Sequence, residues 1–274
     1  MQWFRNDRIS ADSTLDSVPD PGSTDLTVVI SGARSAIMGC RWRHTQSLAS
    51  AVGSPPPSVK QRWRGSVQDR PDDPLRLTAK ERAAGAAVLG RAFAEYEVLR
   101  HYFPDETQRH TIANTFVFIG LAVCLKYGEV YATSEKLEGV AAWLPPGKAP
   151  FGGWQILRSV PLPTLIRFGR QGAGRMQAYG RFVDRLHRRL LPYPHWYLQV
   201  IGVDPAYHGQ GFSSRLIRPM LERIDRERMP CSLETNINKN VAIYRRFGFE
   251  IISEDKMPGT PVTSFLMLRK PPTL

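Results

Sequence analysis

The stretch that most constrains the fold is residues 196–216, WYLQVIGVDPAYHGQGFSSRL. It opens with an apolar run of β-forming composition, residues 196–203, and Pro205 ends that run because proline cannot donate to a strand ladder. A loop with two glycines follows, and beyond it apolar residues recur at spacings of three and four, which predicts an amphipathic helix. These apolar residues are Leu216, Ile217, Met220, Leu221 and Ile224.

A strand, a glycine loop and a helix in succession can form an anion-binding site. Glycines let the backbone approach a ligand closely, and the first amides of a helix lack partners inside the helix. With the positive end of the helix dipole, these amides suit a phosphate or pyrophosphate. The same glycines are also common in a plain turn, so this feature alone leaves both interpretations open. The loop has neither the Lys-Ser/Thr pair of the P-loop nor the third glycine of the dinucleotide fingerprint.

The loop as a whole resembles the coenzyme A loop of the GNAT superfamily of N-acetyltransferases, and a second motif downstream resembles the same family. The first motif is Val203-x-Pro205-x-x-His208-Gly209-x-Gly211-x-Ser213-x-x-Leu216. The second is the expected strand Cys231-Ser-Leu-Glu234-Thr-Asn followed by Asn240-x-x-x-Tyr244-x-x-x-Gly248-Phe249. The resemblance implies an α/β (α+β) fold of GNAT type. Its central sheet would be mixed and mostly antiparallel, splayed between two strands and flanked by helices.

The resemblance also implies acetyl-CoA as cosubstrate and assigns residues to it. The splayed strands leave backbone groups unpaired, and an amide-bearing arm can pair with them as if it were a strand. The backbone amides of the loop would hold the pyrophosphate, and Asn240 would bind the coenzyme with its side chain. The strand residues are Ile201, Gly202 and Val203, and the loop residues are His208, Gly209, Gln210, Gly211, Phe212 and Ser213.

Two loop residues depart from the family pattern. His208 stands where the family usually has Gln or Arg, and a neutral histidine would place less charge near the phosphates. Ser213 stands where the family usually has Gly or Ala, and we expect it to cap the helix that follows. Pro219 lies well inside that helix and is expected to kink it.

Two residues are the predicted catalytic groups. Asn240 and Tyr244 lie four residues apart on an expected helix and share a face; in the family the matching tyrosine points at the coenzyme sulfur and can protonate the departing thiolate. Core packing against Phe247 is the alternative for Tyr244. Glu234, half-buried on the strand beside the cleft, is the candidate base, with an edge-strand ion pair as an equal alternative. His195 is a second candidate base, although its position favours a strand-entry role.

A narrower resemblance, over about residues 75–271, is to the puromycin N-acetyltransferase group. It rests on His195-Trp196-Tyr-Leu, Leu233-Glu234-Thr235, GRAFAEYEVLRHYFPD and a tail from Pro258 to Pro271. Members of that group acetylate the amine of an aminonucleoside antibiotic. The segment 145–190, which would wall the acceptor pocket, is where the resemblance is weakest.

Composition narrows the remaining alternatives. The 274 residues carry a net charge of +12 and three scattered cysteines, which give neither a disulfide framework nor a metal pattern. A reduced, cytoplasmic protein is expected, because no secretory signal is present and five early aspartates argue against mitochondrial targeting. The basic stretch 158–189 either forms a solvated helical face or attracts an anionic cofactor or an acidic substrate. No motif for nucleic acid or membrane accompanies this charge, and the sequence gives no signal for an oligomeric state.

We expect residues 1–73 to be a disordered extension, with one strand-like run at 26–30, and residues 74–274 to form the GNAT domain. A strand at 75–77 and a capping box, Thr78-x-x-Glu81, would open an alanine-rich helix. A buried helix at 106–127, a hairpin at 129–144 and helices broken by Pro161 and Pro163 would follow. The leading function is acetyl transfer to a primary amine of a small molecule by direct attack on the thioester. A protein lysine or N-terminal acetyltransferase and a non-catalytic coenzyme A-binding module are the alternatives.

Overall fold

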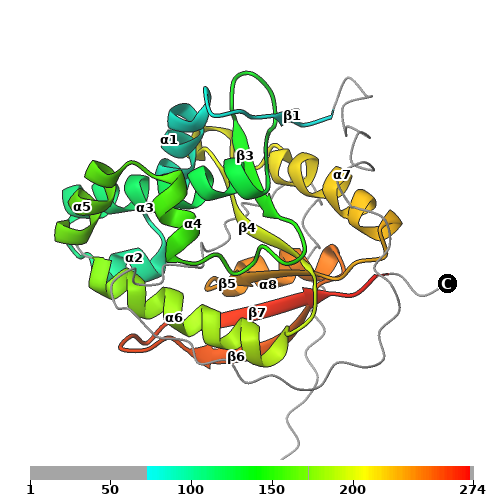
Figure 1. The fold of residues 1–274 in the computed structure, drawn as a ribbon. Coiled ribbons are helices and arrows are strands. Elements are labelled where there is room, and N and C mark those ends of the chain that lie inside the picture. Colours follow the sequence, from blue (N-terminus) through cyan, green and yellow to red (C-terminus); the bar gives the residue numbers. More distant parts are fainter. Residues whose placement is uncertain (1–72, 172, 272–274) are drawn as a thin grey trace, which may run out of the picture.

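The centre of the fold is a seven-stranded mixed sheet in the order β1-β2-β3-β4-β5-β7-β6. The computed structural model describes residues 73–171 and 173–271. Only β4 and β5 are parallel, and all other neighbouring strands are antiparallel, so the predicted sheet is confirmed (Figure 1). The strands are β1 (Leu75–Arg76), β2 (Glu129–Ala132), β3 (Gly139–Leu144), β4 (Trp196–Val203), β5 (Cys231–Thr235), β6 (Glu250–Lys256) and β7 (Thr263–Arg269).

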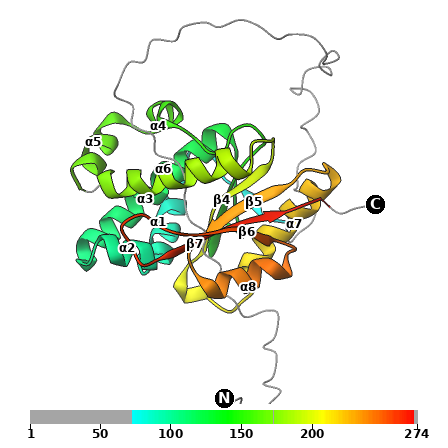
Figure 2. The ribbon, with the colours of Figure 1, turned by 90° about the horizontal axis from the view of Figure 1, so that it is seen from below.

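Helices cover both faces of this sheet. Figure 2 shows α1 to α6 on one side and α7 and α8 on the other. Each layer encloses its own apolar cluster, with Phe93, Val117 and Phe182 in the first and Leu216 and Ile217 in the second. The helices are α1 (Arg82–Phe93), α2 (Glu97–Tyr102), α3 (Glu106–Tyr127), α4 (Gly153–Ser159), α5 (Leu162–Gln171), α6 (Ala173–Leu190), α7 (Phe212–Arg226) and α8 (Asn238–Arg246), with a short 3-10 turn, η2 (Pro205–Tyr207), before α7.

The apolar helix α3 is a core helix, as its sequence predicts. Asp105 caps its start by accepting a hydrogen bond from the Gln108 amide at 2.7 Å, and the helix ends before Gly128. Among the described helices, α3 alone has the length and composition of a membrane span. More than half of its most apolar window, 56%, is buried inside the fold, because the helix packs against α1 and the sheet.

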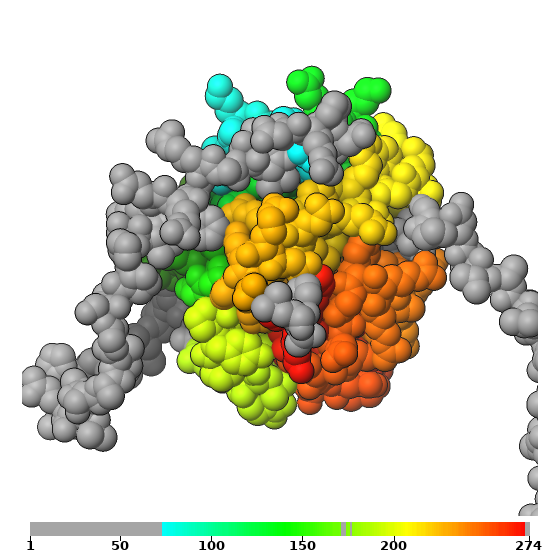
Figure 3. Space-filling view, turned by 90° about the vertical axis from the view of Figure 1, so that its right-hand side faces the viewer, coloured from blue at the N-terminus to red at the C-terminus, as the bar shows by residue number. Residues whose placement is uncertain are grey.

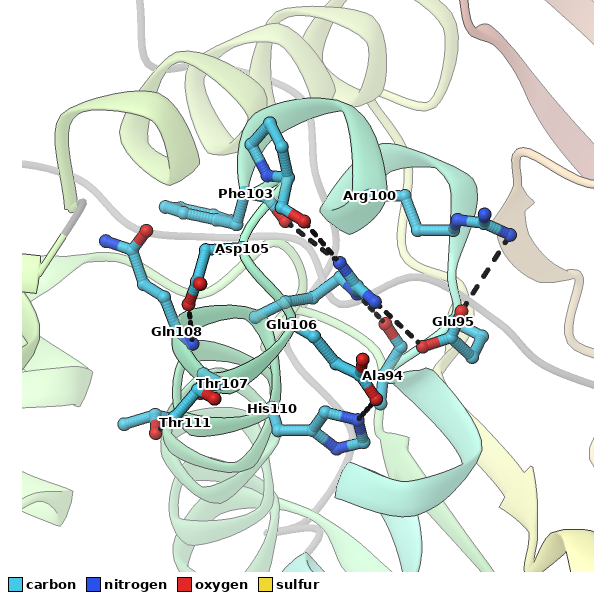
Figure 4. Close-up of polar contacts among 12 residues, drawn as sticks. Ala94, Glu95, Arg100, Phe103, Asp105, Glu106, Thr107, Gln108, His110 and Thr111 are labelled. Atoms are coloured by element: carbon cyan, nitrogen blue, oxygen red, sulfur yellow. Dashed lines mark hydrogen bonds and ion pairs between the residues drawn. The ribbon is translucent and has the colours of Figure 1, made fainter.

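A buried arginine at the start of α3 holds the turns around α2 (Figure 4). The Arg109 side chain donates to the carbonyl oxygens of Ala94, Phe103 and Pro104 at 2.9, 3.3 and 3.0 Å. It also forms an ion pair with Glu95 at 3.1 Å. Sequence analysis predicted neither this contact nor α2. Arg109 therefore fixes the chain between α1 and α3, a segment that borders the site described below.

Two predicted helix caps differ from the structure. Glu81 accepts from the Thr78 amide at 2.8 Å, but the Thr78 hydroxyl donates to the Glu81 carboxylate instead of accepting from its amide. Both hydrogen bonds therefore join Thr78 to Glu81, neither caps an amide of the helix, and α1 begins only at Arg82. Ser213 does not cap α7, because the helix begins at Phe212 with Gly211 in the N-cap position. Gly211 takes that position with φ of 76°, a left-handed conformation that costs glycine little.

The remaining predictions on the described residues mostly hold. β2 and β3 form the expected hairpin, α4 to α6 follow the breaks at Pro161 and Pro163, and α7 continues through Pro219. Strands β6 and β7 were not predicted. The strand-like run at 26–30 and, apart from Asp73, the extension at 1–73 lie outside the described residues. Cys124 and Cys231 are buried free thiols, and Cys40 lies in the segment that the structure does not describe.

Candidate functional site

The two parallel strands at the centre of the sheet separate soon after they begin. β4 and β5 pair only at Trp196–Cys231 and Tyr197–Ser232. β4 then runs on to Val203 without a partner strand on that side, while its other edge stays paired with β3. Among the described residues, the backbone of residues 200–203 therefore has no partner strand on the β5 side, which leaves this edge able to pair with an extended ligand. Ile201, Gly202 and Val203 lie in this stretch, as the sequence predicts.

A bulge in β4 lies just beyond the point of separation. Ala142 of β3 faces Val200, whereas the next residue, Trp143, faces Leu198. Gln199 is thus the extra residue on β4. A bulge bends its strand and increases the local twist, and bulges are frequent next to active sites because they re-aim local groups. This bulge gives a physical reason for the divergence of β4 from β5.

The glycine loop follows β4 after the short turn η2 and lies at the surface beside α7 (Figure 3). Gly209 and Gly211 have φ of 78° and 76°, and a Cβ built on Gly209 would meet nothing within 4 Å. His208 is exposed, and its Nε2 lies 3.0 Å from the Val203 carbonyl oxygen. A carbonyl only accepts, so Nε2 carries the hydrogen and the ring is turned back toward the end of β4. The amides that begin α7 stand at the end of this loop, as an anion site requires.

An ion pair that sequence reasoning missed anchors the loop. Arg91, in the last turn of α1, donates to the Asp204 carboxylate from Nε at 2.8 Å and from NH2 at 2.5 Å. Burial raises the pKa of Asp204, but the hydrogen bonds from Arg91 and from the Ala206 amide outweigh burial and lower the pKa. The loop therefore starts from a fixed point between β4 and α1. No motif signalled this pairing, because the two residues lie 113 positions apart.

Helix α8 brings Asn240 and Tyr244 to the sheet, and both are buried. The Tyr244 ring packs edge-on against Phe249, with centroids 5.9 Å apart, in an apolar cluster against which Phe247 also packs. The Tyr244 hydroxyl has no hydrogen-bond partner among the described residues. Burial raises the pKa of this phenol well above its ordinary value, and the nearby Tyr96 adds to the rise. Tyr244 is therefore a neutral phenol whose hydroxyl makes no hydrogen bond to the part of the chain that the structure describes.

Glu234, on β5, is fully buried and not half-buried as expected. Its Oε1 accepts from His187 Nε2 on α6, and its Oε2 accepts from the Tyr197 hydroxyl on β4. β5 is an inner strand of the sheet, and the described partners of the Glu234 carboxylate are a buried histidine and a buried tyrosine, so the edge-strand ion pair supposed as its alternative role does not describe it. Glu234 points to the α6 side of the sheet, whereas its neighbour Leu233 packs with Tyr244 on the α8 side. The two predicted catalytic residues thus lie on opposite faces of β5.

Further titratable groups surround Glu234. His195, just before β4, donates from Nδ1 to the Tyr193 carbonyl at 2.8 Å, and its ring lies 5.5 Å from that of His187. Burial lowers the pKa of His195, against the opposing effect of that hydrogen bond. Burial also raises the pKa of Tyr179 on α6, and the charge of Glu234 raises it further. His195 fits the strand-entry role, but it also belongs to this cluster. His187 and Tyr179 escaped sequence analysis because they lie in a helix that shows only an amphipathic pattern.

A pocket opens on the same side of the sheet as Glu234. It has a volume of about 500 Å³ and is bounded by the end of α2, the first turns of α6 and the turn between β6 and β7. Segment 145–190, which the sequence predicts to wall the acceptor pocket, contributes residues of α6 to this pocket. Among the described residues, no group of three or more His, Cys, Asp and Glu side chains is arranged to hold a metal. The lining residues are His101, Tyr102, Pro104, Gly174, Arg175, Ala178, Pro258 and Gly259.

Comparison with known proteins agrees with this arrangement. The family model of the acetyltransferase (GNAT) domain matches residues 170–251, which run from the end of α5 to the start of β6. An uncharacterized N-acetyltransferase of Schizosaccharomyces pombe is 27% identical over 183 residues, 64% of this chain and 72% of that protein.

Two other relatives extend the comparison. The N-alpha-acetyltransferase RimI of Mycobacterium tuberculosis is 28% identical over 119 residues, 43% of this chain and 73% of that protein. A solved structure from Corynebacterium glutamicum, described as histone acetyltransferase HPA2 and related acetyltransferase, superposes with a TM-score of 0.52 at 21% identity. That superposition covers 74% of this chain and 97% of the other, and it supports the fold. The chain therefore matches the acetyltransferase (GNAT) domain model over residues 170–251 and has a fold similar to that of a solved acetyltransferase, and these similarities support an N-acetyltransferase.

Proposed function

We propose that this enzyme transfers the acetyl group of acetyl-CoA to the primary amine of a small molecule by direct attack of the amine on the thioester. The observation that carries this proposal is the separation of β4 from β5 between a glycine loop and two groups that can move protons. Tyr244 lies on one face of β5 and Glu234 on the other. The GNAT family uses acetyl-CoA.

The residues at the strand separation fit acetyl-CoA. The free edge of β4 would pair with the amide groups of its arm through Ile201, Gly202 and Val203. Gly209 and Gly211 carry no side chain that would cover the loop backbone. The backbone amides of residues 208–213 would therefore hold the pyrophosphate. Asn240 would contact the coenzyme from α8. When bound, acetyl-CoA supplies the activated acetyl group.

Tyr244 has the properties that a proton donor needs. Its pKa is raised by burial, so the phenol keeps its proton at neutral pH, and its hydroxyl has no hydrogen-bond partner within residues 73–171 and 173–271. Such a group can protonate a thiolate as it leaves. Glu234, held by His187 and Tyr197, is the carboxylate predicted to serve as the base for the proton of the incoming ammonium.

The pocket beside α2 and α6 favours a small acceptor. Its volume of about 500 Å³ is within the range of about 300–1,000 Å³ that small-molecule sites occupy. A protein lysine or N-terminus is the second candidate. The similarity to an N-alpha-acetyltransferase favours it, and so do the exposed arginines of α5 and α6, which would attract an acidic peptide.

Thiol release from acetyl-CoA by the purified full-length protein tests the proposal. The panel holds puromycin, simple primary amines, and peptides with a free N-terminus or a lysine. We expect release to be stimulated by at least one small amine and to exceed that with any peptide. Stimulation by peptides alone would replace the small molecule by a protein substrate, and release without any acceptor would contradict transfer to an amine.

Replacing Gly209 by Ala is expected to raise the KM for acetyl-CoA about tenfold or more. The left-handed conformation costs an L-residue about 1–2 kcal/mol, and the new methyl group would stand where the loop backbone must meet the phosphates. Gly147→Ala is the matched control, because Gly147 has φ of 77° with equal space around it but lies in the turn after β3. Both variants should lose similar stability in thermal unfolding. An unchanged KM in Gly209→Ala would remove this loop from coenzyme binding.

A further inference from the structure

Three buried polar atoms near Glu234 have no hydrogen-bond partner among the described residues. They are His187 Nδ1, Tyr179 Oη on the same helix, and His195 Nε2 at the entry to β4. Buried polar atoms in folded proteins are nearly always paired with protein or with water, and an unpaired one costs desolvation free energy. Three such atoms around one carboxylate indicate a place where a polar ligand group completes the site.

Hydrogen bonding fixes the tautomer of both histidines. A carboxylate only accepts, so the nitrogen of His187 that contacts Glu234, Nε2, carries the hydrogen. Its Nδ1 then has a lone pair. A carbonyl oxygen also only accepts, so His195 carries its hydrogen on Nδ1, against Tyr193, and has its lone pair on Nε2. The unpartnered nitrogens are thus two acceptors, and they match the N–H donors of a primary ammonium.

Glu234 itself is poorly placed to meet an amine. It is fully buried, and each of its oxygens already accepts a hydrogen bond, one from His187 and one from Tyr197. The His187 ring contacts the Tyr197 ring edge-on at 5.0 Å and the His195 ring at 5.5 Å. A carboxylate behind an imidazole selects one tautomer and stabilises the imidazolium that forms when the other nitrogen takes a proton. The pair His187–Glu234 has this arrangement.

We propose that His187 takes the proton of the acceptor amine at Nδ1, that Glu234 is the positioning residue behind it, and that His195 Nε2 and Tyr179 Oη help to hold the ammonium. The inference rests on the proposed function. The N–H bond of the ammonium breaks, its electron pair stays on nitrogen for attack on the acetyl carbonyl, and the proton becomes a second N–H on His187. The imidazolium stays paired with the Glu234 carboxylate until the proton is returned to solvent.

The groups that face His187 support this assignment. Glu234 of β5 is the one anion that contacts its ring among the described residues, while Tyr197, His195 and Tyr179 are neutral groups from β4, the β4 entry and α6. The pKa of His195 is lowered by burial, so this ring stays neutral and does not compete with His187 for the proton.

The kinetic test is His187→Asn, which keeps a polar side chain but removes the base. We expect kcat/KM for the amine to fall about 10²–10⁴-fold, with the KM for acetyl-CoA unchanged and the acid-side decline of the pH–rate profile lost. His110→Asn is the matched control, since His110 is a half-buried histidine on α3 that forms an ion pair with Glu106. Glu234→Gln should lower the rate less and displace the acid-side decline. A folded His187→Asn enzyme with the wild-type rate and pH profile would overturn the proposal.

A second test needs no turnover. Nitrogen-15 NMR of the wild-type protein at neutral pH should show His187 protonated on Nε2 and not on Nδ1, and addition of n-butylamine should shift the Nδ1 resonance but not those of His110. Protonation on Nδ1, or no response to the amine, would overturn the role of His187 even in an active enzyme. If no amine is acetylated while these NMR results hold, the proposed function fails and the ammonium site remains.

Discussion

Tyr244→Phe is expected to lower kcat about 10²–10⁴-fold and to leave the protein at least as stable as the wild type. The hydroxyl is fully buried and unpaired, so its removal takes away a group whose desolvation costs about 1–3 kcal/mol and breaks no hydrogen bond of the described residues. The ring and its edge-on contact with Phe249 remain. If Tyr244 served only in packing, the Tyr244→Phe enzyme would keep its turnover. If its hydroxyl made a structural hydrogen bond, the variant would lose stability.

The measurement is thiol release under saturating substrates, with thermal unfolding of the same preparations. The KM for acetyl-CoA should change little, because the hydroxyl is needed only as the thiolate leaves. Tyr127→Phe is a matched control, since Tyr127 is a partly buried tyrosine at the end of α3. Unchanged kcat in Tyr244→Phe would remove the proton-donor role and leave Tyr244 as a core aromatic.

The half of the fold around β4 could be predicted because its signals are local. The apolar run of β4, the glycines of the loop and the period of α7 each fix an element within a short window. The same holds for α8, which ends before Gly248 with φ of 82°. Strands β6 and β7 escaped because they carry polar and apolar residues without clean alternation, and because β7 joins the sheet through a non-local pairing with β5 while β6 pairs only with β7 among the described strands.

Part of the candidate site could also be predicted from local sequence, and part could not. Gly209, Gly211 and Tyr244 stand in a motif of fixed spacing, whereas the partners of Glu234 come from separate elements. His187 lies 47 positions before Glu234 in an arginine-rich helix, where a histidine looks like one more polar residue. A sequence pattern predicts which face of a helix is buried, but it does not predict which buried carboxylate will contact that face. For that reason, the network around Glu234 needed tertiary structure.

The two wrong caps share a physical cause. Ser213 and Thr78 both have the residue type of an N-cap, but in each case the backbone nearby sets the start of the helix. Gly211 adopts the left-handed conformation one residue before α7, so Ser213 falls inside the helix. The Thr78 hydroxyl donates to the Glu81 carboxylate, and Thr78 itself lies four residues before the start of α1. A residue type that favours the N-cap therefore indicates roughly where a helix begins, but it does not identify which residue occupies the N-cap position.

The second large effect is expected for Arg109→Met, which should lower the free energy of unfolding by about 3 kcal/mol or more. Methionine fills a similar volume but has no donor for the carbonyl oxygens of Ala94, Phe103 and Pro104. Each buried oxygen left unpaired costs about 1–3 kcal/mol. The ion pair with Glu95 adds little, because the Glu95 side chain is 60% exposed.

Arg100→Met is the control for this prediction, because Arg100 pairs with the same Glu95 at 3.8 Å from an exposed position. It should change stability by no more than about 0.5 kcal/mol. Thermal unfolding measures both variants, and about 3 kcal/mol corresponds to roughly 6–12 °C for a domain of this size. Arg109 also holds the segment that carries Tyr96 and Tyr102, so the KM for the amine should rise in Arg109→Met while that for acetyl-CoA stays constant. Equal, small losses of stability in the two variants would show that the carbonyl oxygens find other partners, and that Arg109 is not what fixes α2 beside the pocket.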